Sequence, residues 1–161
     1  MKYSTKVDEK TGLLRIRAEE DLGSIKKGDL GGLIEFLENL SQYEDAWIYE
    51  GALVFGDARV HGNAQVFGNA QVFGAARVCG NAQVFGAARV CGAARVHGNA
   101  QVFGTAQVHG AARVFDDAWV SGAAEVFGNA EVFGNAQVHG NAQVHGAARV
   151  HGDAWVYGDI T

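Results

Sequence analysis

The stretch GNAQVFGNAQVF at residues 62–73 contains one hexapeptide twice, and the same pattern runs through most of the chain. From Ala46 to Ala154 an alanine recurs at every sixth position, nineteen times in all, and an isoleucine or valine follows each alanine by two residues. Self-similarity at a fixed period is the signature of a repeat architecture. Because strand side chains alternate in direction, the alanine and the valine of Ala-x-Val-x face one interior. A glycine, often followed by Asn or Asp, then turns the corner, so each hexapeptide is one short strand and one corner.

The outward residue after each alanine shows how many hexapeptides form one coil. Sorted with a period of 18 residues, the tryptophans share one column: Trp47, Trp119 and Trp155. Five of the six arginines in this slot share a second column: Arg59, Arg77, Arg95, Arg113 and Arg149. Only Arg89 falls in the third column. The sequence therefore predicts an all-β fold, a triangular parallel β-helix of three hexapeptides per coil, with coils stacked roughly 4.8 Å apart.

Residues 1–44 have a different texture and contain all five lysines of the chain. Tyr3 to Lys6 and Leu13 to Arg17 are expected to form a β-hairpin around a turn at residues 8–12. Leu33 to Leu40 is expected to form one or two helical turns. We therefore divide the chain into an N-terminal cap, residues 1–44, and a hexapeptide-repeat solenoid, residues 45–161.

Composition restricts the classes of partner and the compartment. The net charge of −5 argues against a nucleic-acid binder, which usually carries a basic surplus. No apolar run approaches the ~20 residues that a membrane-spanning helix needs, so no membrane partner is expected. The N-terminus lacks the apolar core of a signal peptide, which favours a cytoplasmic location. Cys79 and Cys91 fall in different columns, so no internal disulfide is expected.

The repeats at about residues 45–157 resemble the hexapeptide-repeat, left-handed β-helix superfamily. The resemblance implies a left-handed coil, which the spacing alone does not. Many members of that superfamily are trimeric acyl- or nucleotidyltransferases, and some are zinc carbonic anhydrases. RIRA at 15–18, KGDLGG at 27–32 and ENL at 38–40 resemble a largely uncharacterised bacterial and phage-borne group that is called transferase-like mainly on fold. Because fold alone does not establish activity, the resemblance implies a cap-plus-solenoid architecture, with no catalytic residue and no cofactor.

The arginine column is the main candidate for a binding surface. Like charges stacked at strand spacing repel one another, and Glu131 interrupts the column and relieves only part of this repulsion. One interpretation is a solvated face with stacked guanidinium groups. The alternative is a surface that binds an anion or an acidic partner, with Arg59, Arg77, Arg95, Arg113 and Arg149 as contacts.

All six histidines occupy the slot after the valine, where phenylalanine is also common. The simpler interpretation is a stacked aromatic ladder in which histidine replaces phenylalanine. The functional alternative is a zinc site formed by His61, Cys79 and His97, which are 18 residues apart and should stack on one face. Zinc requires ligands that converge at 2.0–2.3 Å, and residues spread over two coil steps, roughly 9–10 Å, fit this poorly.

These observations predict a non-enzymatic scaffold or interaction protein. Nineteen hexapeptides follow one another without an inserted loop, whereas function usually resides on loops carried by a scaffold. Self-association is expected, either through unpaired strand edges of the last coil or through a Phe-rich face. The alternatives are a hexapeptide acyl- or nucleotidyltransferase with a site between subunits, and an end-to-end polymer similar to the bactofilins.

Overall fold

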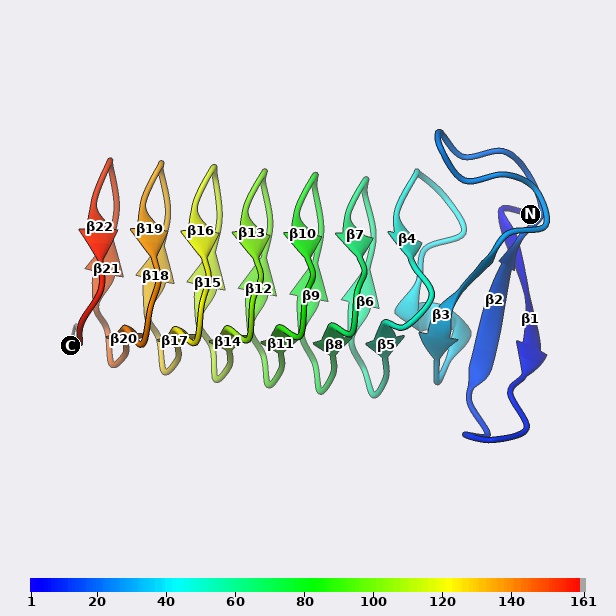
Figure 1. The fold of residues 1–161 in the computed structure, drawn as a ribbon, viewed down its shortest axis with the longest axis horizontal. Coiled ribbons are helices and arrows are strands. Elements are labelled where there is room, and N and C mark those ends of the chain that lie inside the picture. The colour runs from blue at the N-terminus through cyan, green and yellow to red at the C-terminus, as the bar shows by residue number, and fades with distance from the viewer. Residues whose placement is uncertain (160–161) are drawn as a thin grey trace.

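The computed structural model describes residues 1–159 and shows an elongated stack of parallel coils. In Figure 1 the coils follow one another along the long axis, and the three longest strands lie at the N-terminal end. Almost all of the regular structure is β-strand, with one short 3₁₀ helix. The predicted fold class, an all-β parallel solenoid, is confirmed.

Three sheets, whose strands are parallel within the coils, form the sides of the solenoid. The first sheet continues from the N-terminal strands and contains β1 (Tyr3–Val7), β2 (Leu14–Ala18), β3 (Leu30–Ile34), β5 (Leu53–Val54), β8 (Gln71–Val72), β11 (Arg89–Val90), β14 (Gln107–Val108), β17 (Glu125–Val126) and β20 (Gln143–Val144). The second contains β4 (Trp47–Ile48), β7 (Gln65–Val66), β10 (Gln83–Val84), β13 (Gln101–Val102), β16 (Trp119–Val120), β19 (Gln137–Val138) and β22 (Trp155–Val156). The third contains β6 (Arg59–Val60), β9 (Arg77–Val78), β12 (Arg95–Val96), β15 (Arg113–Val114), β18 (Glu131–Val132) and β21 (Arg149–Val150).

The register of these strands confirms the predicted coil of 18 residues. Val84 pairs with Val66 on one side and with Val102 on the other, and the two neighbouring sheets keep the same offset. Each strand is two residues long, and a corner separates it from the next. Successive strands of the chain therefore belong to successive sides of the prism.

The interior consists of stacked alanine and valine, as the alternation predicts. Ala100 and Val102 are fully buried, and so are their equivalents in the coils on either side, such as Val84 and Val120. Each buried valine contributes roughly 1.5–3 kcal/mol relative to an exposed one, so stability accumulates coil by coil. The two cysteines, Cys79 and Cys91, are free thiols on different sides of the prism.

The corners are built from glycine because the backbone turns there with positive φ and the next coil lies close. Gly80 has a φ of 67°, and a Cβ at this position would come within 3.0 Å of both the backbone N and O of Gly98. In the same corner column, Glu44 and Asp116 are the two non-glycine residues with positive φ in the described chain. The residue after the glycine adds a ladder of amides, in which Asn81 Nδ2 donates to Asn99 Oδ1 at 3.0 Å.

The predicted hairpin at the N-terminus is confirmed, because β1 and β2 pair antiparallel. β2 pairs in turn with β3, and β3 pairs parallel with β5 of the first coil. The predicted helix from Leu33 to Leu40 is largely wrong: only Leu37–Asn39 forms a 3₁₀ turn (η1). Leu33 and Ile34 belong to β3 instead, because β5 offers them a parallel edge to pair with. The left-handed twist and the division at residue 44 stay predictions.

Buried polar groups attach the N-terminal segment to the first coil. The Lys2 Nζ donates hydrogen bonds to the carbonyl oxygens of Ala46 at 2.8 Å and Glu44 at 3.2 Å. The Asn39 side-chain amide donates to the carbonyl oxygens of Gly56 and Ala58, both at 2.8 Å. A buried polar group is costly unless it is hydrogen-bonded, so these contacts specify one docking geometry.

Candidate functional site

The outward side chains of the third sheet form a continuous charged surface, which we call the arginine face. It consists of Arg59, Arg77, Arg95, Arg113, Glu131 and Arg149 on β6, β9, β12, β15, β18 and β21. Each residue pairs in register with its neighbour 18 residues away. The structure therefore brings together all five arginines that the sequence singled out. They point outward because the adjacent valine of each two-residue strand points inward.

The arginines in the C-terminal half of the arginine face are paired within the face. Glu131 accepts from Arg149 Nε at 3.1 Å and lies 3.5 Å from Arg113 Nη1, so one carboxylate serves two guanidinium groups. Each of these arginines also lies over an aromatic ring, Arg113 over Phe115 at 5.3 Å and Arg149 over Phe133 at 5.1 Å. Cation–π contact and ion pairing both lower the energy of a stacked guanidinium.

The N-terminal half of the arginine face carries an unbalanced charge. Arg59, Arg77 and Arg95 are exposed. Within residues 1–159 none of the three makes an ion pair or lies over an aromatic ring. Their charges repeat at coil spacing, and like charges directly opposite one another in a sheet are destabilising. An incoming anion would relieve this repulsion.

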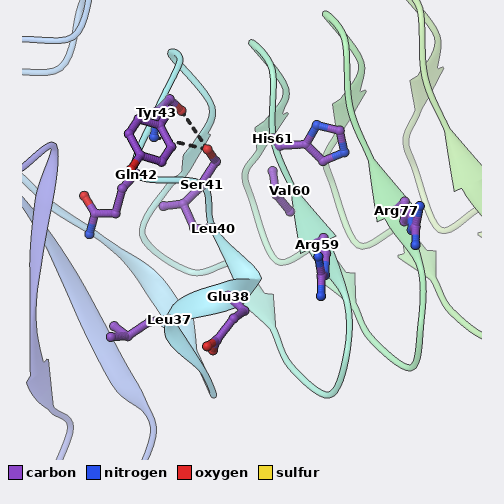
Figure 2. A pocket seen from close by; sticks show the side chains of 10 residues that line it. All are labelled: Leu37, Glu38, Leu40, Ser41, Gln42, Tyr43, Arg59, Val60, His61 and Arg77. Carbon is purple, nitrogen blue, oxygen red and sulfur yellow. Dashed lines mark hydrogen bonds between the residues drawn. The ribbon is translucent and has the colours of Figure 1, made fainter.

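A groove of about 590 Å³ lies where the N-terminal segment meets the arginine face, and we call it the junction groove. Its lining residues are Leu37, Glu38, Leu40, Ser41, Gln42, Tyr43, Arg59, Val60, His61 and Arg77. Figure 2 shows Arg59 and Arg77 on successive strands, with Glu38 on the N-terminal side of Arg59. The Ser41 amide donates to the Val60 carbonyl at 3.0 Å, which holds the N-terminal wall beside β6. The groove thus opens directly onto the unbalanced arginines.

His61, Cys79 and His97 lie at the ends of β6, β9 and β12, so the predicted alignment on one face is correct. Within the described chain, no group of three or more His, Cys, Asp or Glu side chains is placed to hold a metal ion. Burial raises the pKa of the Cys79 thiol, which disfavours the thiolate that zinc requires. Burial, with Arg113 as a lesser cause, lowers the pKa of His97, which favours the neutral imidazole. Of these two shifts, only the raised pKa of the Cys79 thiol opposes zinc binding, and the zinc interpretation stays a prediction.

Most histidines stack as the ladder interpretation predicts. The ring centroids of His97 and Phe115 are 5.0 Å apart and nearly parallel, and His109 stacks on Phe127 in the same way. Phe127 continues to His145 at 5.1 Å. Such aromatic pairs contribute roughly 0.5–1.5 kcal/mol beyond the area they bury. These imidazoles act as structural rungs beside the arginine face and on the neighbouring edge.

Sequence reasoning missed two parts of this region. One is the junction groove, because the sequence predicts a helix and a cap at residues 37–43 but does not indicate that they lie beside Arg59 and Arg77. The other is the corner that follows each arginine strand, where Gly62 N donates to Glu44 Oε2 at 2.6 Å and Gly134 N donates to Asp116 Oδ2 at 3.2 Å. The interruption of the glycine column by these two acids was the available signal.

Comparison with known proteins agrees with the architecture. A family model described as YdcK Beta solenoid repeat matches residues 64–80 and 76–92. The two matches overlap and together cover less than two of the 18-residue coils, so they show similarity of the repeat and not membership for the whole chain. No curated protein matches the chain. The described residues contain no helix with the length and apolar character needed to cross a bilayer. Sheet topology and repeat similarity together show a β-solenoid repeat protein.

Proposed function

We propose that this protein is a non-enzymatic interaction scaffold whose arginine face docks a partner that carries carboxylates. The observation that carries the proposal is the set of three exposed arginines, Arg59, Arg77 and Arg95, that stand in register without an ion-pair partner in the described chain. A guanidinium group binds a carboxylate through two parallel hydrogen bonds, which gives both energy and orientation. The solenoid fixes the spacing of the strands that carry these arginines, so binding has to order the side chains but not the backbone.

The charge of the whole molecule favours an acidic protein segment over a nucleic acid. The chain has a net charge of −5, and two acidic residues limit the unpaired arginines, with Glu38 beside Arg59 in the junction groove and Glu131 within the arginine face. Nucleic acids present one phosphate after another and are bound by surfaces with a broad basic surplus. A narrow column of three positive charges suits a partner with a few spaced carboxylates.

The test measures the affinity of fluorescently labelled poly-L-glutamate for the full chain by anisotropy at increasing salt. We expect saturable binding that weakens with salt, and Arg77→Ala should reduce the affinity about three- to tenfold, because a hydrogen-bonded charged contact is worth roughly 1 kcal/mol or more. Arg89→Ala is the matched control, because Arg89 lies on another side and stacks over Phe73 at 5.1 Å. Equal affinities for the two variants would overturn the proposal, and so would stronger binding of a single-stranded oligonucleotide of the same charge.

A further inference from the structure

The corner at the end of the arginine strands presents a column of backbone amides. Position 80 follows the Arg77 strand by two residues, and position 98 follows the Arg95 strand in the same way. The carbonyl oxygens of Gly80 and Gly98 join the ladder between coils, accepting from the amides of Asn63 and Asn81 at 2.8 Å. Their N–H groups donate to no acceptor within residues 1–159.

The chain itself shows what these amides bind. Glu44 occupies the same corner column one coil before Gly62, and its Oε2 accepts from Gly62 N at 2.6 Å. Asp116 occupies the column one coil before Gly134, and its Oδ2 accepts from Gly134 N at 3.2 Å. At the corner that precedes β6, Glu35 Oε2 accepts from Gly56 N at 2.8 Å. Three carboxylates therefore sit on three corner amides, each of which belongs to a glycine with positive φ.

We propose that the amides of Gly80 and Gly98 are carboxylate-binding sites for the acidic partner, and that they work together with Arg77 and Arg95. This inference rests on the proposed function and specifies its ligand. Each of these coils offers one guanidinium on its strand and one free amide at the corner three residues later, so the partner presents acidic side chains to both rows. A hydrogen bond from a backbone N–H to a carboxylate is charge-assisted and therefore strong, and the contacts of Glu44 and Asp116 show that this corner can form one. The Glu44 contact marks the N-terminal limit of the row, because it fills the Gly62 amide.

The sharpest test fills one amide without changing the charge. Asn tolerates positive φ, and the side-chain oxygen introduced by Gly80→Asn can reach the Gly98 amide as Asp116 reaches Gly134. Gly86→Asn is the matched control: its φ is 66° against 67° at Gly80, and a Cβ there meets the next coil at 2.9 Å against 3.0 Å. Gly86 follows β10 of the second sheet, so its corner does not end an arginine strand. We expect Gly80→Asn to weaken poly-L-glutamate binding about three- to tenfold, and Gly86→Asn to leave it unchanged.

A second measurement needs no variant. In the ¹⁵N-labelled chain, titration with poly-L-glutamate should move the amide protons of Gly80 and Gly98 downfield, as expected for new hydrogen bonds to carboxylates. The amide protons of Gly86 and Gly104 should not move. If Arg77→Ala weakens binding but the Gly80 and Gly98 resonances stay fixed, the amide inference is overturned while the arginine face stands. If Arg77→Ala has no effect, the proposed function itself is wrong.

Discussion

The stacking of corner glycines leads to a prediction that uses two adjacent coils of one corner. Gly122 and Gly140 have φ values of 64° and 67°, so alanine is strained to the same degree at both. A Cβ at Gly122 would lie 2.9 Å from the backbone N and 3.0 Å from the O of Gly140. At Gly140 a Cβ would meet nothing within 4 Å. The two substitutions Gly122→Ala and Gly140→Ala therefore differ only in the contact with the following coil.

The expected free energies follow from these two terms. A left-handed backbone costs alanine about 1–2 kcal/mol, and the less flexible unfolded chain returns about 0.4–1 kcal/mol. Gly140→Ala should therefore destabilise the protein by about 0–1.6 kcal/mol. Gly122→Ala adds overpacking against backbone atoms that no rotamer change can move, which costs a further ~1–3 kcal/mol.

Equilibrium urea unfolding followed by circular dichroism measures both values, with the slope of the transition compared to show that the same surface is exposed. We expect the midpoint for Gly122→Ala to lie clearly below that for Gly140→Ala. If both variants lose the same free energy of unfolding, the contact between corners is not limiting. The close stacking of the coils would then not be the reason for glycine at these positions.

Four further predictions follow from the packing and the charges. Ala100→Leu overfills the interior and should lower stability by about 1–3 kcal/mol in thermal melts, and an unchanged melt would contradict the packing. Burial lowers the pKa of Lys2 to about 8, so between pH 8 and 10 the unfolded chain binds more protons. The free energy of unfolding should therefore rise by up to about 2 kcal/mol from pH 8 to pH 10, and Lys2→Met should flatten this rise. The measurements end at pH 10, because burial raises the pKa of Tyr3 to about 12 and the free energy of unfolding should fall again at higher pH. Glu131→Gln should cost no more than about 1 kcal/mol, because its partners are largely exposed, yet tighten poly-L-glutamate binding. Sedimentation velocity across a concentration series should show self-association; a concentration-independent monomer would refute it, and a stable trimer would instead favour the transferase alternative.

The features that follow from strict periodicity could be predicted. Alanine and valine recur without a miss, so one direction of side chains had to be the interior, and Ala100 and Val102 are indeed fully buried. The grouping of Arg59 with Arg77 and Arg95 follows from the 18-residue period alone, and the strand register confirms it. The handedness of the coil could not be predicted from the period, because left-handed and right-handed coils have the same residue spacing.

The features that depend on non-local contacts or backbone direction could not be predicted. Leu33 and Ile34 have an apolar pattern that suits a short helix, but an available strand edge on β5 made them a strand. The pairing of Arg113 and Arg149 with one carboxylate depends on how the Glu131 side chain is placed between them. The free amides of Gly80 and Gly98 depend on the orientation of each corner peptide, and the residue types alone do not determine that orientation.

The period of 18 residues also governs how such a protein can change in length. Duplicating or deleting one whole coil would restore every pairing between equivalent residues, because Val84 contacts Val66 and Val102 through the same geometry. Duplicating a single hexapeptide would instead rotate all later residues by one side of the prism and carry the later arginines, such as Arg149, out of line with Arg59. The outward side chains of a coil are thus gained or lost together with that coil. The arginine face can therefore be lengthened or shortened in steps of roughly 4.8 Å while the N-terminal segment stays docked on the first coil.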